Sequence, residues 1–194
     1  LATQNPIEQE GTYNLPEAQL DRFMFLINVG YPTKEEELEI VKRTTVEQKH
    51  EINAILNEAD IQNLQQIVRR VPVADAMVQY AVNLARWTRH KQPEAPDFIK
   101  EWVAWGAGPR AAQNLILGAK ARAILQGRNY VSGDDIRAVA HPVLRHRVLV
   151  NFAAEAEGLT SDSIVDKLLE VVPRQESEAL SDGNLPKVLG SQNS

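Results

Sequence analysis

The first apolar stretch of the chain is short and unbroken. Residues 23–29 read Phe-Met-Phe-Leu-Ile-Asn-Val and are followed by Gly-Tyr-Pro at 30–32. A brief apolar run of this kind is typical of a strand buried on both faces of a parallel sheet. A second strand is predicted at 1–5, and Pro16 favours a short helix at 16–21 between the two. The chain therefore opens with an alternation of strands and helix.

From Thr33 onward the polar and apolar positions predict helices. Thr33 is a suitable helix cap, and the acidic residues 35–37 suit the positive end of the helix dipole. Asp60 and Asp75 are the predicted starts of two further helices, and Pro109 is the predicted start of a long one. The apolar faces expected to be buried are Ile61, Leu64, Ile67 and Val71, then Met77, Tyr80, Ala81, Leu84 and Trp87, then Ala112, Leu115, Ile116, Ala119 and Ala123.

Local signals also mark where the later helices begin and end. Gly127 is a plausible stop for the long helix, because glycine readily ends helices in a left-handed conformation. Ser132 and Asp135 have the spacing of a capping box ahead of Ile136 and Val139. A last helix is predicted over 161–172, before Pro173.

These patterns divide the chain into three parts. Residues 1–32 are predicted to be an α/β segment, residues 33–173 a helical bundle, and residues 174–194 a disordered tail or linker rich in Ser, Glu, Gln, Gly and Asn. The fold class is mixed α/β, mostly α. No internal repeat indicates a solenoid.

Composition narrows the class of protein. The chain has 194 residues, of which 43% are hydrophobic and 24% charged, as in an ordinary globular protein. No apolar run approaches the roughly 20 residues that cross a bilayer. The absence of cysteine rules out disulfides and thiolate metal sites, and it fits a cytoplasmic protein. The net charge of −5 argues against binding nucleic acid over the whole surface. Because Leu1 is not a methionine, we expect an excised fragment.

Asn5 is the first candidate for chemistry. It lies at the predicted exit of a strand, where parallel sheets place their ligand sites. An amide that both donates and accepts can orient a water molecule beside a phosphate. The alternative is an ordinary residue of an Asx turn.

Arg22 is the second candidate. It lies between a predicted helix and a predicted buried strand, so its charge has to point outward or be paired. Offered to a neighbouring subunit, it could stabilise charge on a transferred phosphoryl group. The alternative is an ion pair within the chain, with Glu17 or Asp21.

Arg110 is the third candidate, within the segment Gly106-Ala107-Gly108-Pro109-Arg110. The first turn of a helix disfavours a cation by about 0.3 to 1 kcal/mol, and a nearby anion would reverse that penalty. Glycine access at Gly108, the free N–H groups of the helix end beginning at Pro109 and the guanidinium would then converge on one phosphate. The alternative is a surface arginine at a turn.

Other side chains suggest weaker possibilities. His141 and His146 have a poor spacing for a shared metal, and Pro142 interrupts them, so no metal site is predicted. The basic residues of 137–147 are interpreted as a solvated end of the bundle or a subunit contact, with an acidic partner as the alternative. Trp87, Trp102 and Trp105 are interpreted as core or interface residues.

Two long segments resemble the MoxR family of AAA+ ATPases. They are Ala-Thr-Gln-Asn-Pro-Ile-Glu-Gln-Glu-Gly-Thr-Tyr at 2–13 and Leu-Pro-Glu-Ala-Gln-Leu-Asp-Arg-Phe at 15–23. Gly-Tyr-Pro at 30–32, Gly-Pro-Arg-Ala at 108–111 and His-Pro-Val-Leu-Arg-His-Arg at 141–147 also look like family segments in the right order. The resemblance implies that residues 1–32 are the end of the parallel α/β core of an AAA+ ATPase and that residues 33–173 are its helical lid.

The resemblance also implies roles for the candidate residues. Asn5 would be the sensor 1 residue that positions the attacking water, and Arg22 the arginine finger that reaches the nucleotide of a neighbouring subunit. Arg110 would be the sensor 2 residue of the lid, binding the γ-phosphate within one subunit or between two. The whole protein would use ATP and Mg²⁺, form a ring, commonly a hexamer, and remodel a client protein in the manner of a chaperone. A protein with a von Willebrand factor A-type domain is one candidate client.

The sequence also departs from the family. It contains no Gly-x-x-x-x-Gly-Lys-[Ser/Thr] loop and no acidic Walker B strand, and both are needed to hold ATP and magnesium. These elements are expected upstream of Leu1, so this chain alone is expected neither to bind ATP tightly nor to hydrolyse it.

Two other classes of function compete with the ATPase. A non-enzymatic helical module for protein interaction or regulation would use the arginines only to hold partners. A DNA-binding domain is suggested weakly by the helices between Pro109 and Arg147, but the net acidity of the chain argues against it.

Overall fold

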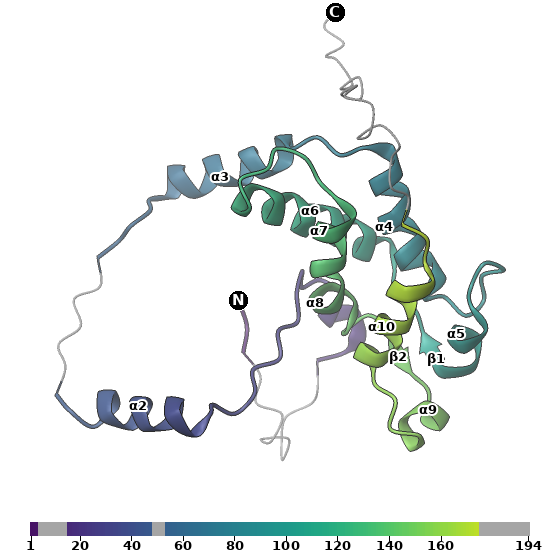
Figure 1. Cartoon of the computed structure of the whole chain (residues 1–194), viewed down its shortest axis with the longest axis horizontal. Coiled ribbons are helices and arrows are strands. Elements are labelled where there is room, and N and C mark those ends of the chain that lie inside the picture. The colour runs from purple at the N-terminus through teal and green to yellow at the C-terminus, as the bar shows by residue number, and fades with distance from the viewer. Residues whose placement is uncertain (4–14, 48–52, 175–194) are drawn as a thin grey trace, which may run out of the picture. The chain divides into compact units, whose positions relative to one another are not determined.

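The structure is a computed structural model that describes residues 1–3, 15–47 and 53–174 (Figure 1). It separates into two compact units, of which the larger comprises Leu1–Leu26 with Val68–Ser194 and the smaller Ile27–Ile67. The predicted tail from 175 onward lies outside the described residues. The helices are α1 (Glu17–Leu20), α2 (Lys34–Thr44), α3 (Glu58–Arg70), α4 (Asp75–Trp87), α5 (Asp97–Trp102), α6 (Pro109–Leu125), α7 (Gly133–Ala138), α8 (Ala140–Leu144), α9 (Phe152–Ala156) and α10 (Ser161–Val171).

The smaller unit contains α2 and most of α3. The predicted start of α2 is confirmed, since Thr33 and Glu36 each donate a backbone N–H to the other's side chain, at 2.8 and 3.3 Å. The predicted start of the next helix at Asp60 was wrong. Asn57 is the cap, because its side chain accepts from the Asp60 N–H while Asp60 accepts from the Asn57 N–H, both at 3.0 Å.

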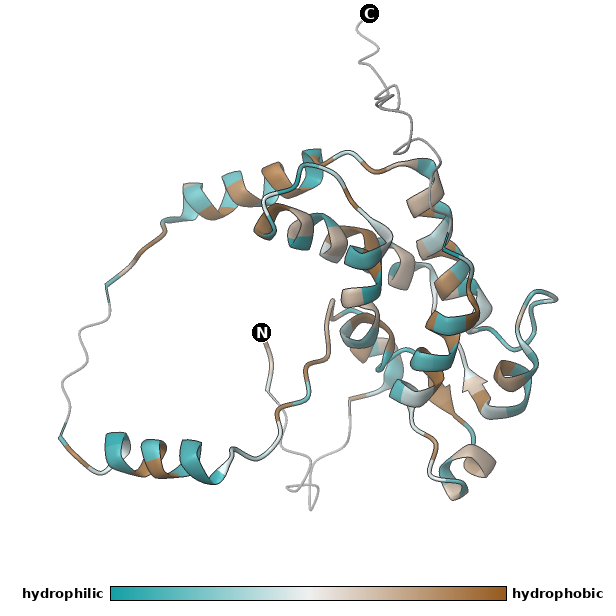
Figure 2. Cartoon of the chain, viewed as in Figure 1, coloured by the Kyte–Doolittle hydropathy of each residue, from teal (hydrophilic) through white to brown (hydrophobic). Residues whose placement is uncertain are grey.

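The expected burial of the α3 stripe is also not found. Neither α2 nor α3 has a buried side chain among the described residues. Figure 2 shows hydrophobic and hydrophilic residues together along both helices. Ile61, Leu64 and Ile67 therefore remain about half exposed, and only Val71, just beyond α3, is buried.

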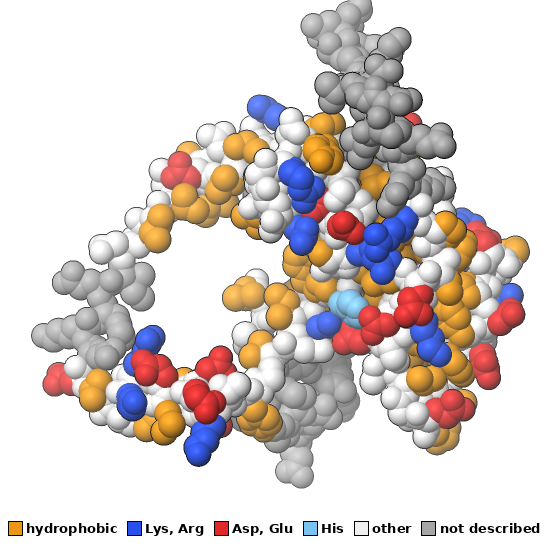
Figure 3. Space-filling view, viewed as in Figure 1, with side chains coloured by type: hydrophobic (Ala, Val, Ile, Leu, Met, Phe, Trp, Pro, Cys, Tyr) orange, Lys and Arg blue, Asp and Glu red, His pale blue; other side chains and the backbone are white. Residues whose placement is uncertain are grey.

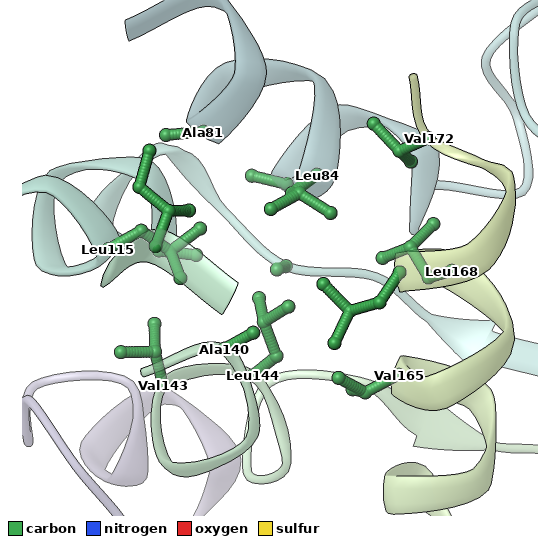
Figure 4. Close-up of a cluster of buried hydrophobic side chains, with 14 of the residues drawn as sticks. Ala81, Leu84, Leu115, Ala140, Val143, Leu144, Val165, Leu168 and Val172 are labelled. Carbon is green, nitrogen blue, oxygen red and sulfur yellow. The ribbon is translucent and has the colours of Figure 1, made fainter. Parts of the chain in front are cut away.

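The core of the larger unit is built from helices α4, α6, α7, α8 and α10. Leu84 of α4, Leu115 of α6, Leu144 of α8 and Leu168 of α10 point toward a common centre (Figure 4) and are completely buried. The stripe predicted for α4 is confirmed at Met77, Tyr80, Ala81 and Leu84, whereas Trp87 is only partly buried.

The later helix boundaries follow the local signals in the sequence. Pro109 is the first residue of α6, and Gly127 follows its end with a φ of +71°. Ser132 and Asp135 form the predicted capping box of α7. A last helix is present as α10, ending one residue earlier than predicted.

The carboxylate of Asp135 does more than cap α7. It is completely buried and accepts hydrogen bonds from Arg122 at 2.7 Å and from Arg128 at 2.6 Å. Burial by itself would raise the pKa of Asp135. The bonds from Arg128, Ser132 and Arg122 outweigh burial and bring its pKa well below the ordinary value. This ion cluster fastens the loop after α6 to the first turn of α7.

The strand predicted at 23–29 is absent. These residues have no regular structure, and their large apolar side chains are 37–91% exposed, except that of the half-buried Met24. A strand needs neighbouring backbones to pair its N–H and C=O groups, and no other described segment supplies a ladder here. Leu26 instead donates its N–H to the Pro142 carbonyl at 2.8 Å.

The sheet that the structure does contain was not predicted. It is a two-stranded antiparallel ribbon of β1 (Val103–Trp105) and β2 (Leu149–Val150), with Val103 opposite Val150. Helices α5, α8 and α9 were also missed, because each is too short for the helical period to repeat. The described residues contain no helix long and apolar enough to cross a membrane.

Candidate functional site around Asp21 and Arg110

The loop that leads into α6 is held against the end of α4. Thr88, which is buried, accepts a hydrogen bond from the Ala107 N–H at 2.8 Å and donates to the Ala85 carbonyl at 2.7 Å. Arg89 donates from Nε to the Ala107 carbonyl at 2.8 Å. Gly106 fits only because it lacks a side chain, since a Cβ there would lie 2.3 Å from the Thr88 carbonyl oxygen. The N–H and the carbonyl of Ala107, just before α6, are therefore both bound by residues that directly follow α4.

Arg110 lies where the sequence predicted, in the first turn of α6. Gly108 is the N-cap residue and Pro109 the first helical residue, while Ala111 is completely buried and anchors the turn. The Arg110 side chain is 48% exposed, and its Nη1 donates to Oδ2 of Asp21 at 2.6 Å. The arginine in this unfavourable helix position thus has an anionic partner, a carboxylate of its own chain.

The same carboxylate is shared with a second arginine. Oδ1 of Asp21 accepts from Nε of Arg147 at 2.8 Å. Asp21 therefore joins two segments that are far apart in the sequence, the start of α6 and the stretch after α8. No pattern in the sequence indicated that Asp21 would be the centre of this site.

Arg147 is almost completely buried, with a side chain that is 1% exposed. It also donates to the backbone carbonyls of Asp21 at 2.8 Å, Phe23 at 2.5 Å and Met24 at 3.3 Å, and to that of Val143. Burial lowers the pKa of Arg147, and the Asp21 carboxylate opposes this shift. The interpretation of 137–147 as a solvated basic end is thus wrong for Arg147, which fastens residues 21–24 to the helices around α8.

His146 supports the same junction. Its Nε2 lies 3.2 Å from the Phe23 carbonyl oxygen, and the residue is 6% exposed. Burial, followed by the nearby Arg147 cation, lowers the pKa of His146. The ring is therefore neutral near pH 7, with its proton on Nε2 facing the carbonyl. Nδ1 is buried and finds no hydrogen-bond partner within the described part of the chain.

Arg22 follows Asp21 directly but takes no part in this network. Arg22 is exposed, and its backbone N–H donates to the Gln19 carbonyl at 3.1 Å. The alternative suggested by the sequence, an ion pair of Arg22 with Glu17 or Asp21, is not formed, and Asp21 pairs with Arg110 and Arg147. Asn5 lies outside the described residues.

His141 and His146 lie in different surroundings. His141 is 3.1 Å from Asp162 and 3.0 Å from Asp166, with Arg145 also bonded to Asp162 at 3.0 Å. Figure 3 shows acidic and basic side chains gathered beside a histidine on this face. In residues 1–3, 15–47 and 53–174, no group of three or more His, Cys, Asp and Glu could hold a metal ion.

The arrangement suits binding of an anion. Arg110 combines a half-exposed guanidinium with the N-terminal end of a 17-residue helix, and Gly108 before it has open space around its α-carbon. A phosphate group fits these features. In this structure the guanidinium of Arg110 is bound by the Asp21 carboxylate of the same chain.

Comparison with known proteins identifies both parts of the chain. Residues 98–168 match the AAA lid domain, and residues 1–25 match the ATPase family associated with various cellular activities (AAA). The lid match contains α6, α8 and Arg147, and the second match contains Asp21 and Arg22.

Individual relatives agree with this assignment. The chain is 42% identical over 172 residues to the chaperone MoxR1 of Mycobacterium tuberculosis, covering 89% of this chain and 45% of the relative. It is 37% identical over 175 residues to YeaC of Bacillus subtilis, covering 89% and 51%. The crystal structure of a proposed ATPase from Cytophaga hutchinsonii matches with a TM-score of 0.80 and 37% identity, over 88% of this chain and 52% of that one.

The chain spans about half the length of these relatives. The matched stretches include the segments at 2–13, 15–23 and 108–111 from which the resemblance was first inferred. The chain belongs to the MoxR family of AAA+ ATPases and carries the lid domain of that family.

Proposed function

We propose that this chain supplies the phosphate-sensing and subunit-coupling parts of an ATPase that remodels a client protein. In this proposal Arg110 binds the terminal phosphate of ATP from the lid, and Arg22 reaches the nucleotide of a neighbouring subunit in a ring. Asn5 would position the attacking water. Gly108 and Pro109 shape the helix end at which the phosphate is received.

One observation carries the proposal. Asp21 holds Arg110 by a 2.6 Å ion pair and is followed directly by the exposed Arg22, so the two arginines suited to phosphoryl transfer are attached to the same short segment. A cation that touches the transferred phosphoryl group stabilises the charge that develops on it. A lid bound at Asp21 is therefore connected to the residue that would act on the neighbouring subunit.

The nucleotide and its magnesium need further groups that these residues do not provide. The 194 residues contain neither the phosphate-binding loop nor the acidic strand, so we infer that the chain alone does not turn over ATP. ATP bound in the whole protein would supply the free energy of hydrolysis, and the residues described here would sense its terminal phosphate. We place this activity in the cytoplasm, in a ring that is commonly a hexamer.

The proposed client is a protein that is folded or assembled with the help of the ATPase. The relative from Mycobacterium tuberculosis is named a chaperone, which favours a folding or assembly role. A partner with a von Willebrand factor A-type domain remains our candidate.

A second candidate function is a non-enzymatic interaction module. It is favoured by the fact that Asp21 already pairs with both Arg110 and Arg147 within the chain. If Arg22 and Arg110 only held partners, replacing either of them would leave ATP turnover of the complete protein unchanged.

The deciding experiment is ATP turnover by the complete protein, at concentrations where it forms its oligomer. Arg22→Ala is expected to reduce kcat by about a thousandfold or more, as for other arginine fingers. Arg43→Ala is the matched control, because Arg43 is also exposed and, among the residues that the structure describes, pairs only with Glu39 on its own helix.

Mixed oligomers then show where Arg22 acts. Arg22→Ala subunits keep their own nucleotide site, and subunits with a defective phosphate-binding loop keep Arg22. Activity restored on mixing the two would place Arg22 across the subunit boundary. Full turnover by a verified Arg22→Ala oligomer would contradict the proposal and favour the interaction module.

A further inference from the structure

We propose that Asp21 is a positioning residue that competes with the nucleotide for Arg110, through a bond that the terminal phosphate has to displace. The inference rests on the proposed role of Arg110 and adds to it a regulating partner within the chain. It follows from the unequal way in which the two oxygens of the Asp21 carboxylate are bound.

The bond to Arg147 is buried and is supported by further hydrogen bonds. The Arg147 side chain is 1% exposed and, besides Asp21 Oδ1, it binds the carbonyls of Asp21, Phe23, Met24 and Val143. Breaking this contact would leave a buried cation without its carboxylate, which proteins tolerate poorly.

The bond to Arg110 is of the opposite kind. The Arg110 side chain is 48% exposed, and its one hydrogen bond within the described residues goes to Asp21 Oδ2, at 2.6 Å. Ion pairs between exposed side chains contribute little, because water solvates both partners when they separate. Arg110 is therefore free to exchange one anion for another at small cost.

Because the two arginines bind different oxygens of Asp21, Arg110 can leave the carboxylate without disturbing Arg147. Asp21 is already about 30% exposed beside Arg110, so when Arg110 turns away Asp21 keeps its bond to Arg147 and its freed oxygen can bind water. Arg147 keeps all of its contacts. Residues 21–24 therefore stay fastened to the lid whether Arg110 binds Asp21 or a phosphate.

A phosphate offers Arg110 more than Asp21 does. It carries more charge than a carboxylate and accepts two parallel N–H bonds from a guanidinium, whereas the bond to Asp21 uses Nη1 alone. The Asp21 contact therefore lowers the apparent affinity for ATP without preventing binding. ADP, which lacks the terminal phosphate, would gain less from displacing Asp21.

The test is a double-mutant cycle in the complete, assembled protein. Binding of a fluorescent, non-hydrolysable ATP analogue and of fluorescent ADP is measured for wild type, Asp21→Asn, Arg110→Gln and the double variant. Asp21→Asn is expected to tighten binding of the ATP analogue about two- to fivefold, the range expected for releasing an exposed ion pair. ADP affinity should change less. In the Arg110→Gln background, Asp21→Asn should have no effect.

The control and a second variant keep the test decisive. Asp134→Asn removes an equal charge from an exposed residue whose one ion pair in the described part of the chain is with Arg174, at 3.4 Å, and should leave nucleotide affinity unchanged. Should Asp21→Asn fail to assemble, Asp21→Ser removes the carboxylate without adding an amide N–H beside Arg147, and it is judged by the same criteria.

The outcomes separate this inference from the proposed function. Unchanged or weaker ATP-analogue binding by Asp21→Asn, with Arg110→Gln still weakening it, would overturn the inference and leave the function standing. Tighter binding of equal size in both backgrounds would also overturn it, because Asp21 would then not act through Arg110. Unchanged binding by Arg110→Gln would contradict the proposed function itself.

Discussion

The α-carbon of Gly106 lies against the backbone of Thr88, so that a Cβ atom at residue 106 would come within 2.3 Å of the Thr88 carbonyl oxygen and 2.8 Å of the Arg89 α-carbon. Because the obstacle is backbone, no side-chain rotation could relieve the clash. The contact brings the loop before α6 close enough for the Ala107 N–H to reach Thr88. The position of Arg110 depends on this close approach.

We expect Gly106→Ala to destabilise the chain by about 1 to 3 kcal/mol, the usual cost of forcing extra volume into a packed site. Urea unfolding of the 194-residue chain measures the effect. Gly133→Ala is the matched control, since nothing lies within 4 Å of its Cβ position and it is the first residue of α7. That variant should be neutral or slightly stabilising. Equal stabilities of the two variants would contradict the packing described here.

We expect Arg147→Lys to loosen the attachment of residues 21–26 to the lid. Lysine keeps the charge but has one nitrogen, so it cannot reach the Asp21 carboxylate and several backbone carbonyls together. Hydrogen exchange of the Leu26 amide, which bonds to the Pro142 carbonyl at 2.8 Å, should become at least tenfold faster, for a loss of about 2 kcal/mol. Arg174→Lys, at an exposed ion pair, should leave that exchange rate unchanged.

We expect Asp135→Ala to reduce the free energy of unfolding by about 3 kcal/mol, because it leaves Arg122 and Arg128 without their carboxylate and removes the cap of α7. Thermal or urea unfolding measures the loss. The neighbouring Asp134→Ala should change stability by less than about 0.5 kcal/mol, since Asp134 is largely exposed. A small effect at Asp135 would show that the two arginines are well solvated without it.

We expect stability to fall as the pH is lowered from 7 toward 5, through His146. Burial holds the pKa of this ring below its ordinary value of about 6.5. Below pH 6.5 the unfolded chain therefore takes up a proton that the folded chain does not bind. The stabilisation is fully present above the unfolded pKa and is lost as the pH falls through the folded one.

His146→Gln should remove this part of the pH dependence, because glutamine does not titrate and its amide can still donate to the Phe23 carbonyl. Urea unfolding of wild type and variant at several pH values between 5 and 8 makes the comparison. The wild-type curve should be steeper on the acid side. Parallel curves would mean that His146 is protonated equally in the folded and unfolded chains.

The sequence alone determined where most of the long helices begin and end. Thr33 with Glu36, and Ser132 with Asp135, form capping boxes because the interaction joins residues three apart. Pro109 and Gly127 act through their own backbone preferences. Such signals are local, so they hold whatever the chain packs against. The misplaced cap at Asp60 shows their limit. Asn57 caps the helix, and Asp60 accepts a hydrogen bond from the Asn57 N–H in return.

The tertiary structure alone decided which apolar and charged side chains are buried and which backbone segments pair as strands. Residues 23–29 have the composition of a buried strand but no strand beside them among the described residues, and a strand exists only when another backbone accepts its hydrogen bonds. Arg145 and Arg147 differ in burial although both lie in one basic stretch.

In the candidate site, too, some features followed from the sequence and others only from the tertiary structure. Sequence placed Arg110 in the first turn of a helix, and the roles inferred by resemblance for Asn5, Arg22 and Arg110 remain predictions. It could not show that Asp21 bonds to both Arg110 and Arg147, which are 89 and 126 residues away along the chain. Contacts at such separations depend on how α6 and α8 pack, and packing is a property of the whole core rather than of any one segment.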